Sequence, residues 1–254
     1  MYHRIGGKST LKGIPLKKFE KQISFLKRKY GLTNVNFTFD HGTLDHYQIA
    51  APLLEKIGAK GIFFVLTAIP ENLEIPSEDK QRRIETLSRK ILAKELCKEF
   101  NFNYRPSISK NYLKRFKFYS IEERYLRLLR DTKVSKEGYE NFINKFYKKI
   151  FGIGKDYVKK NYMSWKHIKE LSKRGHLIGS HSHFHIGDKK DFLKSIRLIE
   201  KKIKKKVVLV SYPNGKKIIS DKELRSIKVK FGYTTDVPLN KNKFKSPRID
   251  CNQV

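Results

Sequence analysis

The chain of 254 residues contains little cysteine. Its two cysteines, Cys97 and Cys251, lie far apart and form no C-x-x-C pair. Disulfide-stabilised scaffolds and cysteine-ligated zinc knuckles both need several cysteines at characteristic spacings. The sequence therefore excludes both classes of protein, and its cysteine usage fits a reducing compartment.

Long apolar runs are missing as well. No stretch approaches the roughly 18 consecutive apolar residues that a membrane-spanning helix needs, and residues 1–10 lack the hydrophobic segment of a secretory signal. Hydrophobic residues nevertheless make up 39% of the chain, which is enough for a folded core. The sequence thus predicts a folded cytoplasmic protein without a transmembrane segment, with contact to a membrane surface as an alternative.

Negative charge is scarce relative to positive charge. The chain has 57 Lys and Arg against 25 Asp and Glu, a net charge of +32. An excess of this size is typical of proteins that bind nucleic acids or other polyanions. Here it is spread along the chain and accompanies many Ile, Asn, Phe and Tyr, as a bias toward AT-rich codons would produce. We therefore favour compositional bias over a nucleic-acid partner, and we keep an acidic glycan or a lipid head group as alternatives.

Short apolar runs bounded by turn residues alternate with segments of helical spacing. The runs indicate buried strands at 35–39, 61–66, 177–180, 207–212 and 233–237. Apolar residues three and four apart indicate helices at 15–30, 47–56, 165–173, 189–204 and 221–230. Gly58 and Gly175 stand where a glycine commonly ends a helix. This alternation predicts an α/β fold with a parallel sheet or barrel.

Residues 76–162 interrupt the alternation. They contain no convincing strand, but helical spacing covers 81–100, 121–131 and 136–151. We interpret this segment as a helical insertion between two strands of a single domain that spans 1–254. We expect its many tyrosines and phenylalanines to pack in a core more often than to form a lid or a substrate wall.

Three polar motifs follow predicted strands, and active sites of barrels collect at that end of the strands. The first is Asp40-His41-Gly42, which alone is typical of a turn. The second is the stretch 180–185, with histidines at 181, 183 and 185. In a helical turn the first and third share a face, and in a strand all three do; either arrangement can bind a metal. The third, residues 212–215, is the sequence Tyr-Pro-Asn-Gly, an ordinary turn signal.

In this order the motifs resemble those of the polysaccharide deacetylases of the NodB-homology group, carbohydrate esterase family 4. The resemblance also includes residues 1–4, 45–46, 51–54, 61–65, 163–165 and 175–181, and it covers nearly the whole chain outside the insertion. It implies a distorted (β/α) barrel of the NodB-homology type. It also implies metal-dependent removal of acetyl groups from N-acetylated sugars.

The resemblance assigns roles to individual residues. Asp40 matches the catalytic base, and His181 and His185 match the two metal-binding histidines of the family. His41 stands where the family usually has a second aspartate, also a metal ligand. Because imidazole is an equally good ligand for zinc, we expect the three histidines to bind a divalent metal, zinc above all. Such a site carries one negative charge less than usual, which makes the metal a stronger Lewis acid.

Other positions match the family pattern only in part. The backbone N–H of Asn214 matches the family's oxyanion donor, and we expect Tyr212 and Pro213 beside the substrate. The family's late histidine, which protonates the leaving amine, and its arginine shortly before the Pro, which orients the base, are both missing. Arg248 is the candidate for a substrate contact or for the missing arginine, and Asp40 is a candidate to return its proton to the amine.

These residues predict a hydrolase of amide carbon–nitrogen bonds, an N-deacetylase. Its substrate would be a cell-surface polysaccharide or its glycan precursor, acidic or lipid-linked, and Asp40 would activate a metal-bound water. The histidine at position 41 and the missing late histidine favour the alternative, a catalytically weak or inactive carbohydrate-binding relative of the same fold. Acetate release that depends on Asp40 and on a metal separates the two hypotheses.

Overall fold

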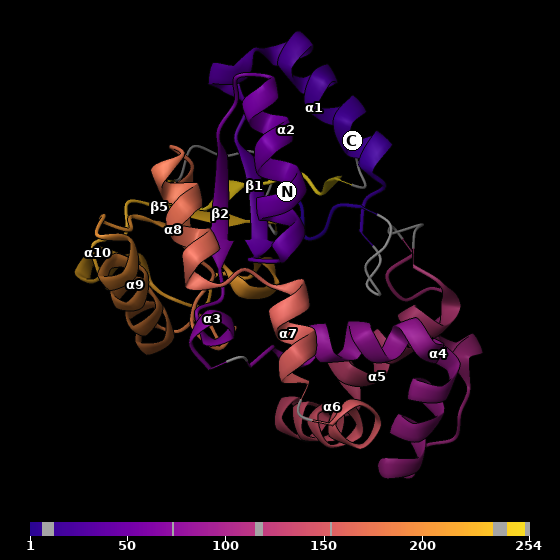
Figure 1. The fold of residues 1–254 in the computed structure, drawn as a ribbon. Coiled ribbons are helices and arrows are strands. Elements are labelled where there is room, and N and C mark those ends of the chain that lie inside the picture. Colours follow the sequence, from indigo (N-terminus) through magenta and orange to yellow (C-terminus); the bar gives the residue numbers. More distant parts are fainter. Residues whose placement is uncertain (7–12, 73, 115–118, 153, 236–242, 252–254) are drawn as a thin grey trace. The chain divides into compact units, whose positions relative to one another are not determined.

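The computed structural model describes residues 1–6, 13–72, 74–114, 119–152, 154–235 and 243–251. Within these residues, six parallel strands form one sheet in which each strand pairs with the next along the chain (Figure 1). They are β1 (Phe37–His41), β2 (Gly61–Val65), β3 (Leu177–Ser180), β4 (Leu209–Ser211), β5 (Phe231–Thr234) and β6 (Ser246–Pro247). The strands curl into a half-barrel, so the predicted α/β fold is confirmed.

The N-terminal residues lie along the edge of β1 that does not pair with β2. The N–H of Tyr2 donates to the carbonyl of Thr38 at 2.8 Å, and the N–H of Asp40 donates to the carbonyl of Tyr2 at 3.0 Å. The carbonyl of Met1 accepts from the N–H of Cys251 at 3.1 Å. Residues 1–2 therefore connect the segment after β6 with β1 by backbone hydrogen bonds.

Helices link the strands in the first of two compact units, which comprises Met1–Glu74 and Lys155–Val254. They are α1 (Leu16–Tyr30), the π-helical turn η2 (His46–Ala50), α2 (Ala51–Lys56), α3 (Ala68–Asn72), α7 (Lys155–Asn161), α8 (Trp165–Lys173), α9 (Lys189–Ile203) and α10 (Asp221–Ser226), with short 3-10 turns η1 (Leu32–Asn34) and η4 (Pro213–Gly215). Gly58 and Gly175 follow α2 and α8 with φ of 80° and 87°. Glycine adopts this region without strain, so both predicted helix ends are confirmed.

The core of this unit includes β1 and β2, two strands that are buried at every position. Strands of a parallel sheet covered on both faces often carry apolar residues in continuous runs, as β2 does, whereas β1 alternates apolar and polar residues. The rings of Phe39 and Phe63 stack across the pair with centroids 4.8 Å apart. Phe19 of α1 meets the ring of Tyr2 edge-on at 5.0 Å. This packing fixes the end of β1, from which two of the candidate site residues project.

The second compact unit, Ile75–Gly154, is inserted in the chain between α3 and α7. It contains α4 (Ser77–Glu99), the 3-10 turn η3 (Pro106–Ser109), α5 (Ile121–Thr132) and α6 (Lys136–Phe151). Serines at the starts of α5 and α6, Ser120 and Ser135, accept hydrogen bonds from the backbone three residues on. The predicted helices are confirmed, and the described residues of the unit contain no strand, as expected.

Aromatic side chains form much of the interior of the helical unit. Tyr125, Tyr139, Phe142 and Tyr147 are all buried. The hydroxyl of Tyr139 donates to the side-chain oxygen of Gln81 at 2.8 Å, which satisfies a polar group that burial would otherwise leave without a partner. For these residues the expected packing role is confirmed.

Several boundaries differ from the predicted ones. β1 lies two residues later than predicted and so includes Asp40 and His41. α10 stops at Ser226 rather than Lys230, because Lys228 takes a left-handed conformation with φ of 63°. The strand predicted at 207–212 is shorter, and the one at 233–237 begins at Phe231 and ends at Thr234; residues 236–237 lie outside the described residues. β6 was not predicted, because it is very short and contains a proline.

Among the residues that the structure describes, no helix has the length and apolar character needed to cross a membrane.

Candidate active site

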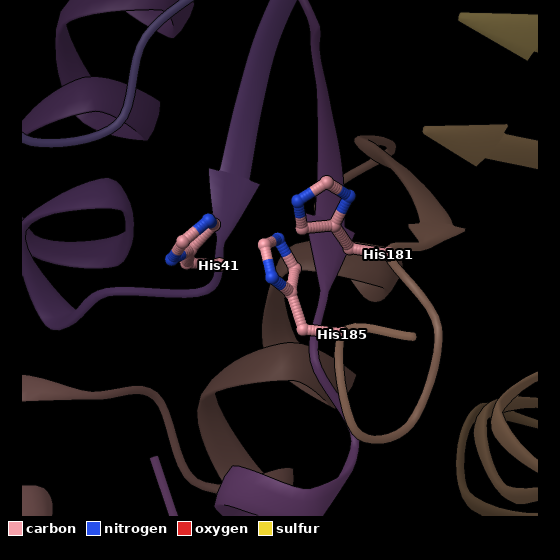
Figure 2. A group of neighbouring side chains, drawn as sticks. All are labelled: His41, His181 and His185. Carbon is pink, nitrogen blue, oxygen red and sulfur yellow. The ribbon is translucent and has the colours of Figure 1, made fainter. Parts of the chain in front are cut away.

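Three buried histidines converge at the carboxyl edge of the sheet (Figure 2). His41 ends β1, His181 directly follows β3, and His185 lies in the loop between β3 and α9. One ring nitrogen from each lies within 4.8 Å of those from the other two. The structure therefore brings together the three residues that the sequence predicts as metal ligands.

His41 belongs to this group and has an unusual backbone conformation. Its φ is 75°, in the left-handed region that residues other than glycine rarely adopt. Its ring centroid lies 5.2 Å from that of His181 and 5.1 Å from that of His185. Strained backbone of this kind persists where the surrounding structure holds it and is frequent at functional sites.

His181 has one ring nitrogen engaged and the other directed toward the group. Its Nδ1 lies 2.9 Å from the carbonyl oxygen of Ser211, which can only accept a hydrogen bond, so Nδ1 carries the proton. This bond leaves the lone pair on Nε2, as in metal-binding histidines whose other nitrogen donates to a carbonyl. Burial holds the pKa of His181 well below its usual range. The imidazole is therefore neutral at pH 7, the form that binds a metal.

The third histidine of the motif, His183, points away from the group. Its Nδ1 lies 2.8 Å from the hydroxyl of Thr67, next to the end of β2. Residues 181–187 form a loop, neither a helix nor a strand. Of the two arrangements considered for the motif, the one that pairs His181 with His185 and separates His183 matches the structure, although the local conformation is not helical.

Asp40, directly before His41, forms an ion pair with a residue far along the chain. The two terminal nitrogens of Arg248 donate to the two carboxylate oxygens at 2.7 and 2.8 Å. Burial favours the neutral acid, but the Arg248 guanidinium outweighs this effect and holds the pKa of Asp40 well below its usual range. Asp40 is therefore ionised at neutral pH, and a bidentate contact fixes the orientation of its oxygens.

The position of Arg248 also decides how that residue takes part in the site. Its side chain is 4% exposed and donates a further hydrogen bond to the hydroxyl of Ser211 at 2.8 Å. Its backbone N–H donates to the carbonyl of Thr234 in β5. Arg248 thus has the geometry of the arginine that orients the base, the second of the two roles considered for it, and its guanidinium is directed at Asp40.

His3, to which none of the motifs assigns a role in the site, lies beside the histidine group. Its ring centroid is 5.2 Å from that of His41. Its carbonyl accepts hydrogen bonds from the hydroxyl of Thr43 at 3.2 Å and from Nε2 of His46 at 2.9 Å. The pairing of the N-terminal residues with β1, which the sequence does not reveal, carries His3 to the site. The only signal was its place in the resemblance, beside Tyr2.

The turn after β4 has two buried residues followed by an exposed one. Tyr212 is buried, its hydroxyl donating to the carbonyl of Phe244 at 2.7 Å, so its side chain belongs to the core instead of a surface open to a substrate. Pro213 is buried as well. Asn214, in contrast, is exposed and has φ of 55°. Asn214 is therefore the exposed residue of this turn.

The donor set fits a catalytic zinc site. Zinc in such sites commonly has three protein ligands and one open position, and three imidazoles are one of the established sets. Here His41, His181 and His185 supply three ring nitrogens in a buried place, with the ionised Asp40 in the preceding position of β1. Arrangements of this type can activate a water molecule beside a carboxylate base.

Sequence comparison relates part of the chain to a known family. Residues 144–235 match the polysaccharide deacetylase family profile. This segment includes His181, His185 and the 212–215 turn but not Asp40 or His41. No curated protein matches the chain in sequence.

Solved structures extend the relation to the fold of the whole chain. The deacetylase PplD of Streptococcus pyogenes, in complex with acetate, has a TM-score of 0.55 and 15% identity over 99% of this chain and 91% of its own. IcaB of Ammonifex degensii has a TM-score of 0.54 and 15% identity over 98% and 88%. The polysaccharide deacetylase BC0361 of Bacillus cereus has a TM-score of 0.51 and 16% identity over 98% and 62%. The predicted resemblance to polysaccharide deacetylases and the predicted fold are thus confirmed.

Proposed function

We propose that the protein is a metal-dependent N-deacetylase that hydrolyses the amide of an N-acetyl group on a glycan. One observation carries this proposal: three buried histidines gather at the edge of the half-barrel where Asp40 is held ionised by Arg248. Amide hydrolysis needs an activated water and a base for its proton, and these groups can supply both. We assign the whole chain to one catalytic domain with the helical unit as an insertion.

We assign a zinc ion to His41, His181 and His185. When bound, the ion would lower the pKa of a water molecule and polarise the acetyl carbonyl. The Nδ1–H of His181 donates to the carbonyl of Ser211, which keeps Nε2 available and fixes the ring orientation. Three neutral imidazole ligands would leave the charge of the ion uncompensated by ligand charge, so the ion would polarise the carbonyl more strongly than in a site with a carboxylate ligand.

Asp40 accepts the proton of the attacking water. Arg248 holds both of its carboxylate oxygens, so the base does not have to reorient when the substrate arrives. Negative charge develops on the acetyl oxygen, and we assign the N–H of Asn214, the exposed residue of the 213–215 turn, as its donor. Pro213, buried just before it, keeps this turn in place.

The amine that leaves must gain a proton, and we assign this step to His3, the histidine beside His41. His3→Gln is expected to lower kcat for an N-acetyl sugar about 10²-fold, because general acid catalysis typically contributes this much or more. The loss should be much smaller with an activated acetate ester, whose leaving group needs no proton. Steady-state kinetics on both substrates measure the difference.

The contacts that the His3 backbone makes with Thr43 and His46 do not involve its ring, so the substitution leaves them intact. Zinc affinity, measured alongside, is expected to stay that of the wild type. Equal losses on amide and ester substrates would contradict a role in protonating the amine.

A row of basic residues on α9 supports an anionic glycan as the substrate. Lys190, Lys194, Arg197 and Lys201, with two leucines between them, line a shallow, open hollow of about 390 Å³ along this helix. The Lys194 ammonium lies 4.8 Å from the ring centroid of Phe184, the exposed residue directly before His185. Lys194 thus lies against the loop that carries a candidate ligand, and the other basic residues continue along the helix, where an acidic cell-surface polymer or its lipid-linked precursor could lie.

Removing two of these charges is expected to weaken the use of an acidic substrate. The double variant Lys194→Gln/Arg197→Gln should lower kcat/KM for an acidic N-acetylated glycan about fivefold at low salt, by raising KM, and should leave a neutral glycan unaffected. High salt should remove the difference by screening. The matched control is Lys17→Gln/Arg28→Gln, which removes the same two charges from exposed positions of α1. Equal effects of both variants would show that only net charge matters.

The test of the proposed function is acetate release from a panel of N-acetylated glycans. We expect the purified protein to release acetate from at least one acidic member, and we expect a chelator to stop the reaction and zinc to restore it. A zinc-loaded protein that binds these glycans but releases no acetate from any of them would refute the N-deacetylase. That outcome would identify the catalytically inactive carbohydrate-binding relative instead.

A further inference from the structure

We propose that Asp191 is a positioning residue that holds His185 in place to bind the metal. Its carboxylate lies in the first turn of α9 and organises the loop between β3 and this helix. The inference rests on the proposed function, because the metal site is part of it. Asp191 belongs to none of the motifs described above, and it does not itself face the three histidines as a ligand.

The carboxylate of Asp191 accepts hydrogen bonds from four backbone N–H groups of this loop. One oxygen accepts from His183 at 3.2 Å and from Phe184 at 2.8 Å. The other accepts from Ile186 at 2.9 Å and from Gly187 at 3.0 Å. The four donors surround His185 on both sides in the sequence. Because each donor points at the same buried group, they fix the path of the backbone from which the His185 side chain projects.

The loop needs such support because its backbone is strained. Ser182 and His185 have φ of 69° and 65°, and Gly187 has φ of 86°. For residues other than glycine, this region costs of order 1–3 kcal/mol and persists only where the surroundings hold it. At Gly187 a Cβ would lie 2.9 Å from Cδ of Pro213, so the loop also packs closely on the turn that contains Asn214. The hydrogen bonds to Asp191 thus stabilise this strained conformation, in which the loop carries His185 and packs on the turn that contains Asn214.

The helix that carries Asp191, α9, is itself hydrogen-bonded to the end of β3. Ser195, one turn further along α9, accepts a hydrogen bond from the hydroxyl of Ser180 at the end of β3, at 2.7 Å. The same Ser180 hydroxyl oxygen accepts from the N–H of Ser182 at 3.0 Å. Asp191 is therefore fixed relative to the strand from which His181 projects. α9 thus contacts the backbone around His185 through Asp191 and the strand end before His181 through Ser195.

A carboxylate suits this position better than an amide of the same size. Two oxygens can each accept two hydrogen bonds, whereas an amide offers one oxygen, and its NH2 group would face two N–H donors. Asp191→Asn is therefore expected to release one half of the loop while changing the side-chain volume little. Loss of a residue that orients a metal ligand typically costs 10–100-fold in metal affinity.

The experiment compares zinc affinities of the apo proteins by competition with a chromophoric chelator. We expect the Kd of Asp191→Asn to be about 10–100-fold above that of the wild type. The absorption of the cobalt(II)-loaded variant should also change, because it reports the geometry of the ligands. The matched control is Asp188→Asn in the same loop. Asp188 caps α9 by accepting from the N–H of Asp191, and asparagine caps helices equally well, so this Kd should stay that of the wild type.

Each outcome bears on the inference. An Asp191→Asn variant with wild-type zinc affinity and cobalt spectrum overturns it, even if the melting temperature falls, because the residue then serves stability alone. If that variant does not fold at the assay temperature, Asp191→Glu takes its place, since it retains the charge but displaces the oxygens; an unchanged Kd there overturns the inference as well. A wild-type protein that binds neither zinc nor cobalt overturns both this inference and the proposed metal-dependent function. If the wild type binds zinc and the Kd of Asp191→Asn is the same, the inference alone is overturned.

Discussion

Replacement of Asp40 by asparagine is expected to lower kcat for acetate release about 10³-fold, because the variant keeps the shape of the base but cannot accept a proton. Zinc affinity should change little, since the three histidines remain. Initial rates of acetate release and chelator competition measure the two quantities. A folded variant that retains a tenth or more of the wild-type kcat would show that Asp40 is not the base.

The same substitution also lowers stability, and this effect has to be distinguished from its effect on catalysis. Asp40 and Arg248 form a buried ion pair, and removing one partner of such a pair typically costs 3–5 kcal/mol. In the double variant Asp40→Asn/Arg248→Gln the unpaired charge is gone as well. We expect the double variant to regain part of the lost free energy of unfolding, measured in urea, but none of the activity. Recovery of activity in parallel with stability would indicate that the single variant was merely unfolded.

Removal of a candidate ligand is expected to have the largest effect of all. His181→Ala should lower zinc affinity by more than about 100-fold, which is the upper end of the loss seen when only an outer partner of a ligand is removed. Its acetate release should fall to that of the chelator-treated wild type, and added zinc should not restore it. Metal analysis after dialysis, together with the rate of acetate release, measures both effects.

His183 provides the control for this prediction from within the same motif. It is buried like His181, but its Nδ1 contacts Thr67 and its ring lies outside the group of three. His183→Asn keeps an acceptor near the Thr67 hydroxyl and should retain both zinc and activity. If both substitutions removed zinc equally, the loss would reflect damage to the loop as a whole, and the assignment of His181 as a ligand would fail.

Local sequence patterns predicted most strands and helices of the first unit because the order of apolar residues and glycines along the chain determines these elements. Continuous apolar runs correspond to β2 and β3, and the spacing of apolar residues corresponds to α1, α8 and α9 within a residue or two. The helix ends at Gly58 and Gly175 follow from the freedom of glycine at positive φ. The short strand β6 has too little apolar character to show such a pattern, although it is the element that leads into Arg248.

The parts of the site that the sequence does not reveal depend on contacts between distant residues. The His-x-x-x-His spacing and the motif order predicted His41, His181 and His185, and the structure brings them together. The contact between Arg248 and Asp40, however, depends on the pairing of β5 with β6 across the sheet. His3 reaches the site only because the N-terminal residues pair with β1. No local pattern encodes either contact.

Tyr212 shows the opposite error, in which a motif residue has a structural role. Its place beside Pro213 predicted a substrate contact, but its hydroxyl lies against Gly232, where an added Cβ would collide with it, and donates to the carbonyl of Phe244. The tyrosine therefore anchors the base of the turn in the core. Motifs record which residues recur together, and a buried residue that shapes a turn looks in sequence like one that touches the substrate.

The left-handed conformation of His41 bears on how this site could change during evolution. With φ of 75°, the position excludes most residue types without strain, but asparagine, aspartate and histidine enter this region several times more often than other side chains. A single exchange between histidine and aspartate would thus be conformationally inexpensive. It would alter the charge of the ligand set by one unit while the backbone kept its path. Within an unchanged fold, this one backbone conformation would therefore allow a single substitution to change the charge of the site.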